Sequence, residues 1–269
     1  MSIKPDDLST TAMHCLQNTS DIESITNFLE YVYYLQQHWD NNELWFRGVS
    51  KSSYKLVPSI YRQTVWKYKS DQANDIYFEF IRKARSCLSD SCSKWEWYHI
   101  MQHYGLPTRL LDWTEGALIA LFFATRKLAE VDNPSVWVID PYWINKSSSG
   151  REEVFWTDSL APEQKIPDLY IESHEKKELP KYPLCLLPSH TNERIRAQRS
   201  CFSVHGRYKD GFKRLCRDKA DARLAKLVIC TDCAQKIKQE LVSAGVKEST
   251  LFPDLEGIAR EIKDEFELN

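Results

Sequence analysis

The first residue with the type and position to do chemistry is Arg47, which directly follows the apolar residues Leu44–Phe46 and precedes Gly48. A guanidinium beside a buried segment needs a partner for its charge. Its planar fork suits a phosphate or a carboxylate, and a following glycine lets a ligand approach the backbone closely. A structural salt bridge, for example to Asp112, would satisfy the same arginine. The context favours ligand binding and leaves the structural alternative open.

A second group of polar side chains lies in the segment HYGLPTRLLDWT, just before one of the most apolar parts of the chain. The segment supplies hydrogen-bonding and stacking groups at His103, Tyr104, Thr108, Arg109, Asp112 and Trp113. As a helix cap, Asp112 would accept amide hydrogens of the next turn, with Glu115 in the capping-box position. The polar groups exceed what one cap requires, and loops of this kind often carry binding sites. Both roles can coexist, because a helix N-terminus itself binds anions.

His103, Tyr104 and Gln198 are candidates for acid–base or ligand-binding roles. The histidine and tyrosine could transfer protons or stack on a ligand, while a histidine at a helix C-terminus also interacts favourably with the helix dipole. Gln198 lies in ERIRAQRSCFSVHG, where the apolar residues change parity between Ala197 and Phe202. A strand can hide both sets on one face only with an extra residue, so we predict a bulge there. Gln198 would then bind a ligand or satisfy the bulge.

The elements that must position these residues follow from hydrophobic spacing and capping signals. Helices are predicted for residues 20–39, with Ser20 or Asp21 as the cap, and for residues 74–88, 94–105, 117–124, 231–245 and 250–266. The last of these helices places Leu255, Ile258, Ile262 and Phe266 on one face. Strands are predicted for residues 44–46, ended by a sharp turn at Gly48, and for residues 135–140, 182–188, 193–206 and 224–230.

These elements predict a single α+β domain with a central mixed or antiparallel sheet flanked by helices. The domain is expected to span residues 20–269, after an N-terminal tail at 1–19. The polar segment at about 144–181 is expected to be a loop-rich insertion.

The composition bounds the class of protein. With 42% hydrophobic and 12% aromatic residues among 269, the chain can bury a sizeable core. Its 36 basic and 38 acidic residues give a formal charge of -2, which argues against general binding to nucleic acid or to a membrane surface. The start of the chain lacks the apolar core of a signal peptide, and no apolar run reaches the roughly 20 residues of a membrane span. We expect a soluble, cytoplasmic protein.

Cysteine spacing raises the question of a metal site. Cys230 and Cys233 have metal-ligand or redox spacing, and Cys87 and Cys92 stand five apart. Neither pair carries a knuckle glycine or nearby histidines, so structural thiols are favoured over zinc and no metal is predicted. The chain also lacks a P-loop, a GxGxxG fingerprint, a GxSxG elbow and an HExxH pair. These absences argue against a Walker ATPase, a Rossmann dehydrogenase and a zincin protease.

Four blocks of the sequence, taken in order, resemble the FRG domain family. They are LWFRGVSKSSYKLVPSIYR, HYGLPTRLLDWTEGALIALFFA, ERIRAQRSCFSVHG and TLFPDLEGIAREI. The resemblance covers about residues 20–262, and the second block is the most specific. The family is named for an aromatic-Arg-Gly triplet, here Phe46, Arg47 and Gly48. Ser200 departs from the family pattern, which has a glycine at this position.

The resemblance implies a fold and an activity. The opening strand that ends in Arg-Gly is similar to the first strand of ADP-ribosyltransferase-like folds, in which an arginine grips the phosphates or ribose of NAD. On that analogy Arg47 binds the pyrophosphate of NAD as a substrate, and His103, Tyr104 or Trp113 lines the nicotinamide pocket. The implied NAD-binding residues are Arg47, Gly48, Thr108, Arg109 and Trp113. The implied catalytic residues are Arg47, His103, Tyr104, Asp112 and Gln198.

The expected function is that of an ADP-ribosyltransferase or NAD glycohydrolase. In such enzymes a glutamate stabilises the developing oxocarbenium ion, but the matching position here is the neutral Gln198, with Glu193 five residues earlier. The resemblance also implies a bacterial or phage-borne toxin or antiphage effector, with an antitoxin or defence component as partner. The alternatives are a non-catalytic module that binds a nucleotide or a partner, and a purely structural Arg47–Asp112 pair. A nuclease is less favoured, because Asp112 has no nearby acidic partner in the sequence except Glu115.

Overall fold

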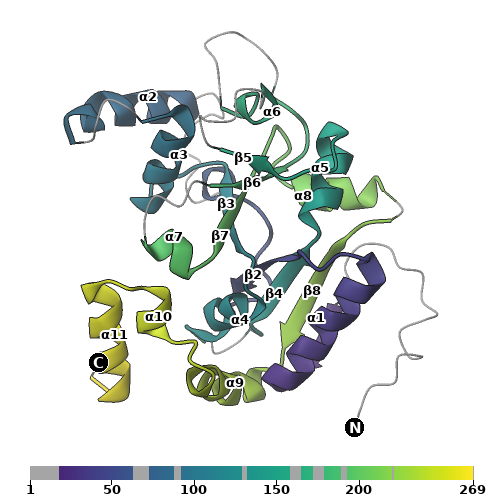
Figure 1. The fold of residues 1–269 in the computed structure, drawn as a ribbon, viewed down its shortest axis with the longest axis vertical. Helices are drawn as coiled ribbons and strands as arrows, with labels where there is room; N and C mark the ends of the chain where they lie inside the picture. Colours follow the sequence, from purple (N-terminus) through teal and green to yellow (C-terminus); the bar gives the residue numbers. More distant parts are fainter. Residues whose placement is uncertain are drawn as a thin grey trace.

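The computed structural model describes residues 18–62, 73–87, 92–128, 132–157, 165–171, 179–188, 193–219 and 221–268. Within these residues a mixed sheet of eight strands carries helices on both faces (Figure 1). The strands are β1 (Asn18–Ile22), β2 (Trp45–Val49), β3 (Leu110–Thr114), β4 (Ser135–Ile139), β5 (Phe155–Trp156), β6 (Leu184–Leu187), β7 (Ser200–Val204) and β8 (Leu224–Ile229). They lie in the order β1-β8-β4-β2-β3-β7-β6-β5. The predicted α+β class with a central mixed sheet is confirmed.

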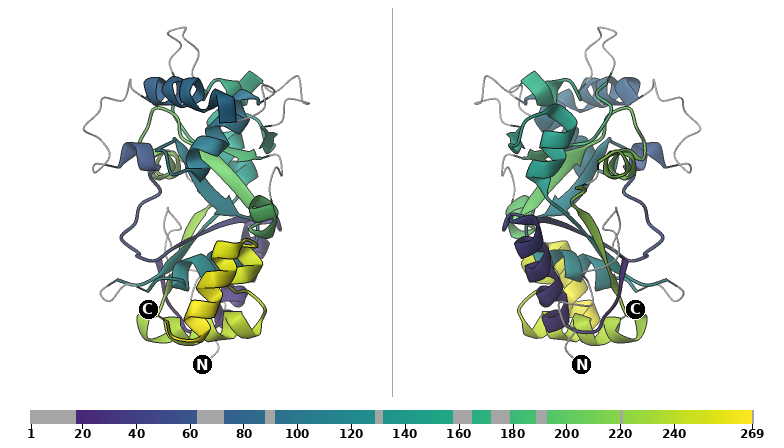
Figure 2. Two further views of the ribbon diagram at one scale, coloured as in Figure 1. Left: turned by 90° about the vertical axis from the view of Figure 1, so that its left-hand side faces the viewer. Right: turned by 90° about the vertical axis from the view of Figure 1, so that its right-hand side faces the viewer.

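The helices gather toward two ends of the molecule, with α2, α3 and α6 at one end and α1, α9, α10 and α11 at the other (Figures 1 and 2). They are α1 (Ile25–Trp39), α2 (Ala73–Ala84), α3 (Lys94–His103), α4 (Ala117–Thr125), α5 (Pro141–Ser149), α6 (Lys165–Asp168), α7 (Glu193–Ala197), α8 (Gly211–Arg217), α9 (Thr231–Ser243), α10 (Glu248–Leu251) and α11 (Leu255–Glu265). Short 3-10 turns cover Ser59–Tyr61 and Arg85–Cys87. No helix in the described ranges is long and apolar enough to cross a bilayer.

Alternate side chains of the central strands enter different cores, as the period of a strand requires. Phe46 and Val136 pack with α1, α4 and α9, whereas Trp45 and Trp137 pack with α5 and α8. A third core joins α2 and α3 to β3, β6 and β7. Because β2 is the fourth of the eight strands in this order, Arg47 lies near the centre of the sheet, with apolar residues on both faces of its strand.

Gly48 allows β2 and α4 to approach each other closely. A Cβ atom at this position would lie 1.9 Å from the carbonyl oxygen of Ala120 and 2.6 Å from the amide nitrogen of Ala124. No side chain fits at such distances, so the position requires glycine. The buried helix predicted over residues 117–124 is confirmed as α4. The sharp turn predicted at Gly48 is wrong, because β2 continues through it to Val49.

The first helix begins later than the sequence predicts. Asn18–Ile22 form β1, which pairs in parallel with β8, so neither Ser20 nor Asp21 caps a helix. Ser24 caps α1 instead, and its side chain accepts a hydrogen bond from the amide of Asn27 at 3.1 Å. Ile22, the one apolar residue of β1, continues the helical spacing of α1 by coincidence, which hides the boundary. Residues 1–17 of the predicted tail lie outside the described residues.

The segment ERIRAQRSCFSVHG is a helix followed by a strand, so the predicted bulged strand is wrong. α7 covers Glu193–Ala197, a turn follows, and β7 begins at Ser200. Arg199 has a φ of 44°, a left-handed conformation that redirects the chain from the helix into the strand. The change of parity in the sequence therefore marks the end of a helix.

Part of the segment at 144–181 is regular structure. α5 extends to Ser149, and β5 pairs in parallel with β6 at the edge of the sheet. The side-chain amide of Asn145 donates to the carbonyl of Cys185 at 3.0 Å, which ties α5 to β6. Residues 158–164 and 172–178 of this segment lie outside the described residues.

Candidate functional site

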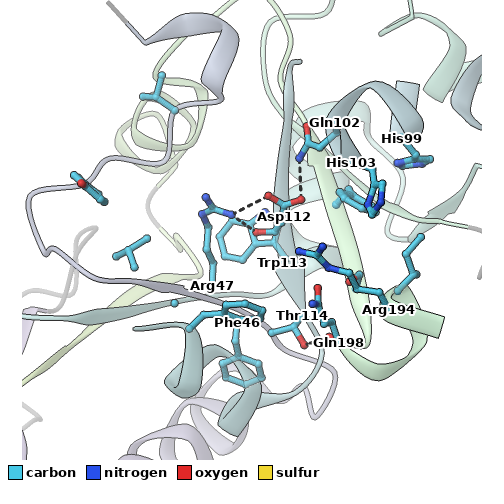
Figure 3. Close-up of a pocket in the computed structure, with 18 of the residues that line it drawn as sticks. Phe46, Arg47, His99, Gln102, His103, Asp112, Trp113, Thr114, Arg194 and Gln198 are labelled. Atoms are coloured by element: carbon cyan, nitrogen blue, oxygen red, sulfur yellow. Dashed lines mark hydrogen bonds and ion pairs between the residues drawn. The ribbon is translucent and has the colours of Figure 1, made fainter. Parts of the chain in front are cut away.

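A large cleft opens where β2 and β3 separate. The two strands share a single backbone pair, Phe46 with Thr114, and diverge beyond it. The cleft has a volume of about 1660 Å³ and is lined from β2, α3, β3, α7, β7 and the segment 50–62 (Figure 3). All the predicted catalytic residues line it, namely Arg47, His103, Tyr104, Asp112 and Gln198. The structure therefore brings these five residues, which lie far apart along the chain, to one cavity.

Arg47 points from β2 toward β3 (Figure 3). Its Nη1 donates to the backbone carbonyl of Asp112 at 2.5 Å and lies 3.6 Å from the carboxylate Oδ2 of the same residue. The Arg47 side chain is 18% exposed and that of Asp112 is 62% exposed, so the ion pair opens into the cleft. Burial lowers the pKa of Arg47, and the charge of Asp112 acts against that shift. The guanidinium stays charged at neutral pH.

Asp112 does not cap α4. It lies in the middle of β3, which pairs with β7, and the N-cap residue of α4 is Gly116. Glu115 approaches Arg199 at 3.6 Å instead of completing a capping box. The capping prediction is wrong, because the residues that precede α4 form a strand. The polarity of Asp112 is explained by the cleft that it faces.

Two residues behind Asp112 hold its carboxylate in place. The Nε2 of Gln102 donates to Oδ1 of Asp112 at 2.8 Å, and the hydroxyl of Thr108 donates to Oε1 of Gln102. Thr108 is completely buried, and its hydroxyl accepts a hydrogen bond from the amide of Leu110 at 3.1 Å. Thr108 therefore supports the site from behind and does not line the cleft, contrary to the prediction that it contacts a cofactor.

Arg109 lies in the core, away from the cleft where the sequence predicted it. Its side chain donates to the hydroxyl of Tyr98 at 3.4 Å and to the carbonyl of Tyr170, and the residue is 3% exposed. Buried guanidinium groups need such partners. The sequence alone could not show that Asp112 faces the cleft while Arg109 faces the core, because the directions of their side chains depend on where β3 begins.

His103 and Tyr104 lie at the rim of the cleft, at the end of α3. Their rings pack edge to face with centroids 5.2 Å apart, and Tyr104 is 73% exposed. Gly105, with a φ of 79°, turns the chain away after them. An exposed aromatic pair at the mouth of a cleft offers a stacking surface to a planar ligand.

Trp113 and Gly48 form part of the wall of the cleft. Trp113 is 3% exposed, its indole N–H donates to the hydroxyl of Ser203 at 2.9 Å, and its ring packs 5.6 Å from that of Phe212. These contacts fix the indole as part of the core. Its contribution to a ligand site is therefore to shape the wall.

Gln198 lies in the turn between α7 and β7, and its contacts differ from those of a bulge residue. Its Nε2 donates to the carbonyl of Leu251 at 3.0 Å, and its own carbonyl accepts from the hydroxyl of Thr114 at 2.7 Å. Nearby Arg194 also lines the cleft, and its guanidinium stacks 4.6 Å from the centre of the Phe252 ring. Gln198 thus joins the wall of the cleft to the C-terminal part of the chain.

His99 is a cleft residue that sequence reasoning missed. Its ring centre lies 4.6 Å from that of Phe202, and its Nε2 lies 3.4 Å from Oγ1 of Thr157. Burial lowers the pKa of His99 to about 4, so the imidazole is neutral at pH 7. His99, Gln102 and His103 recur at the i, i+3 and i+4 positions of one helix. That spacing is the signal that could have grouped them.

Basic groups outnumber acidic groups around the cleft. The lining includes the cations Arg47, Lys55, Arg62 and Arg194 and, among the described residues, the carboxylates Glu96 and Asp112. The Glu96 carboxylate accepts a hydrogen bond from the amide of Ser93 at 2.6 Å as part of the capping box of α3. A concave surface with excess positive charge attracts an anionic ligand.

The cysteine pair of the CTDC segment lies outside this cleft. Cys230 and Cys233 stand at the start of α9, where their mutual hydrogen bond raises the pKa of Cys233 to about 11. Cys87 is exposed and Cys92 lines the cleft. Within the parts of the chain that the structure describes, no three histidine, cysteine or acidic side chains gather in a way that could hold a metal ion.

The model of the FRG domain family matches residues 42–133, which include β2, α3, β3 and α4. The resemblance seen in the sequence is confirmed for this part of the chain. Arg47, Gln102 and Asp112 come from the matched part, whereas Gln198 and Phe202 reach the cleft from outside it. No curated protein and no solved structure matches the chain.

Proposed function

We propose that the cleft binds a phosphate-bearing nucleotide, NAD first among the candidates, and that the protein is an ADP-ribosyltransferase or NAD glycohydrolase. The observation that carries the proposal is the position of Arg47 at the divergence of β2 and β3, facing the cleft. Among the described residues, Nη1 is the guanidinium nitrogen engaged by Asp112. Nε and Nη2 are then free to form the paired hydrogen bonds that a phosphate accepts from arginine.

The size and the lining of the cleft support a dinucleotide. Pockets for small molecules typically enclose about 300–1,000 Å³, and this cleft is larger, at about 1660 Å³. His103 and Tyr104 at the rim and Phe202 inside offer aromatic faces at two separate places. A ligand with two heteroaromatic rings joined by phosphates would stack on these faces and present its phosphates to Arg47.

Asp112 is the residue that we assign to the chemical step. When the bond between ribose and nicotinamide breaks, its electrons leave with nicotinamide and positive charge develops on the ribose, which a carboxylate stabilises. Water or an acceptor nucleophile then adds to the ribose carbon and loses a proton. Asp112 faces the cleft and is oriented by Gln102, whereas the amide of Gln198 is bonded to Leu251. We therefore assign Gln198 to the wall of the cleft.

A non-catalytic nucleotide-binding module is the second candidate. It is favoured by the hydrogen bonds that the two carboxylates of the cleft already accept. Glu96 accepts from the amide of Ser93, and Asp112 accepts from the side chain of Gln102. A carboxylate engaged in this way is a weaker partner for a ribose hydroxyl. Such a module would use Arg47 and the aromatic rim for binding without bond cleavage.

Thermal denaturation with and without millimolar NAD tests the binding site. Wild type and Arg47→Ala are compared with Arg151→Ala, which removes an exposed arginine outside the cleft that pairs with Glu153. We expect NAD to raise the Tm of wild type and of Arg151→Ala but not that of Arg47→Ala. Nicotinamide release, followed by chromatography, then measures the reaction.

The outcomes separate the candidates. Nicotinamide release that Asp112→Asn abolishes supports the enzyme, and a Tm shift without release supports the binding module. If NAD raised the Tm of Arg47→Ala as much as that of wild type, the nucleotide would bind at a site that does not include Arg47. The absence of any shift of wild type with NAD, ADP-ribose or AMP would contradict nucleotide binding altogether.

A further inference from the structure

The C-terminal helix α11 lies on the surface of the molecule (Figure 2). Its apolar side chains are exposed, and polar side chains and Gly257 face the rest of the molecule. A surface helix normally buries its apolar face and exposes its polar face to solvent. Leu255 and Phe266 contribute little to holding the helix in place, and Ile258 and Ile262 keep nearly half of their surface exposed. They are free to contact something else.

The inner side of α11 is fixed by a glycine and by polar contacts. A Cβ atom on the buried Gly257 would lie 2.0 Å from the carbonyl oxygen of Phe252, so the helix packs there backbone to backbone. Glu261 accepts hydrogen bonds from Nζ of Lys247 at 2.9 Å and from the amide of Ser249 at 2.7 Å. These contacts secure α11 without its apolar side chains.

Arg260 adds a third inner contact and links α11 to the cleft. Its Nε donates to Glu248 at 2.6 Å, and its guanidinium lies 4.9 Å from the centre of the Phe252 ring. The same ring carries Arg194, which lines the cleft. A protein bound on the outer side of α11 would therefore stand close to one wall of the cleft.

The outer side of α11 carries four apolar side chains at the spacing of one helical face. We call them the α11 stripe: Leu255, Ile258, Ile262 and Phe266, which are 85%, 44%, 46% and 70% exposed. Exposed apolar residues scattered singly are normal on proteins, but a continuous stripe over three turns marks an interaction surface.

The charges beside the stripe define the chemistry of the partner. Asp254 and Glu265 lie about three turns apart on one flank of the stripe, whereas the other flank carries Lys263 and Glu256, which pairs with Arg260. A second copy of the chain fits poorly as an antiparallel partner, because antiparallel helices would bring Asp254 near Glu265 of the other copy. Like charges at a helix interface are destabilising. A partner with basic flanks is complementary.

We propose that the α11 stripe docks a basic amphipathic helix of a partner protein. Such a helix would carry apolar residues at the i, i+3 and i+7 positions against the stripe and lysine or arginine at its flanks. Apolar contact would supply affinity, and the acidic flank with Asp254 and Glu265 would select the partner and speed the encounter.

The test uses two synthetic helical peptides of about 20 residues, a length at which an isolated helix can form. They share one leucine stripe and differ in having lysine or glutamate at the flanking positions. Fluorescence anisotropy measures their binding to wild type, to Ile258→Ser/Ile262→Ser and to Leu29→Ser/Val242→Ser, which removes two exposed apolar residues elsewhere. We expect the lysine peptide to bind wild type at least about tenfold more tightly than the glutamate peptide. Only the α11 double variant should lose this binding, with its Tm unchanged.

Several results would overturn the proposal. If both peptides bind wild type equally, the acidic side chains do not select the partner. If a peptide binds both double variants equally well, it does not bind at the α11 stripe. A lower Tm of Ile258→Ser/Ile262→Ser means that the chain itself covers the stripe. A wild-type dimer in sedimentation velocity that becomes a monomer in this variant identifies a second copy as the occupant. None of these readouts depends on nucleotide binding in the cleft.

Discussion

β2 has two neighbours in the sheet, and the contrast between them explains the site. On the β4 side five consecutive residues pair, from Trp45 with Ile139 to Val49 with Ser135. On the β3 side the described pairing is limited to Phe46 with Thr114. The same five-residue strand is therefore closed along one edge and open along the other.

The open side shows how a sheet can hold a functional side chain at its centre. Continuing the register from Phe46 and Thr114 would place Gly48 opposite Asp112, where a backbone hydrogen bond is missing. The guanidinium of Arg47 bonds the carbonyl of Asp112 instead. A side chain thus takes the place of a backbone donor, which satisfies the carbonyl and leaves space for a ligand.

Replacing Gly48 by alanine should displace β2 itself, the strand that both sides share, and have the largest effect on stability. The new Cβ would meet the α4 backbone at 1.9 Å, so we expect a loss of about 3 kcal/mol or more in the free energy of unfolding. Gly105→Ala is the control, because its φ of 79° is strained for alanine but open space surrounds it. It should cost only about 1 kcal/mol. Urea denaturation measures both, and equal losses would contradict the close approach of β2 and α4.

Acid should weaken the open side through His99. Burial lowers the pKa of His99 to about 4, below its ordinary value of 6.5, so the unfolded chain binds the proton more tightly. The resulting stability is present above about pH 6.5 and is lost as the pH falls toward 4. Between pH 7 and pH 5 we expect wild type to lose about 1–2 kcal/mol more than His99→Phe. Parallel pH dependence of the two proteins in urea denaturation would show that His99 titrates normally.

Asp112→Asn should have the smallest effect on stability. It tests whether the Arg47–Asp112 pair maintains the fold or serves ligand binding. The Asp112 side chain is 62% exposed, so we expect a change below about 1 kcal/mol in the free energy of unfolding. Removing the charge beside Arg47 should strengthen the binding of ADP-ribose several-fold, measured by calorimetry. A loss above about 3 kcal/mol would instead mean that the pair chiefly maintains the fold.

The fold could be predicted where a segment has one dominant signal. α4 was predictable from an apolar run too rich in alanine for a strand, and the end of α3 from Gly105. β1 was not, because its partner β8 lies some 200 residues away in the sequence and leaves no local trace. α7 was missed because five residues are too short to show a helical period.

The site could be predicted as a set of residues but not as an arrangement. The arginine of Phe46-Arg47-Gly48 was identified by its conflict with an apolar neighbourhood, and Asp112 by the density of polar groups around it. Whether Arg109 or Asp112 faces the cleft depends on the side to which each residue of β3 points. The pairing of β3 with β7 sets that alternation, and no local pattern reports it.

The strand order also shows that the segment matched by the family model lacks strands that its own sheet needs. The part that matches the family, residues 42–133, contains β2 and β3 but ends before β4 begins at Ser135. Its two strands share one backbone pair, and the fuller partner of each lies beyond the match. A recombinant fragment of this part alone would lack both of those partners. The matched segment is therefore smaller than the unit that completes its own sheet, and β4 and β7 from the rest of the chain must pair with its two strands.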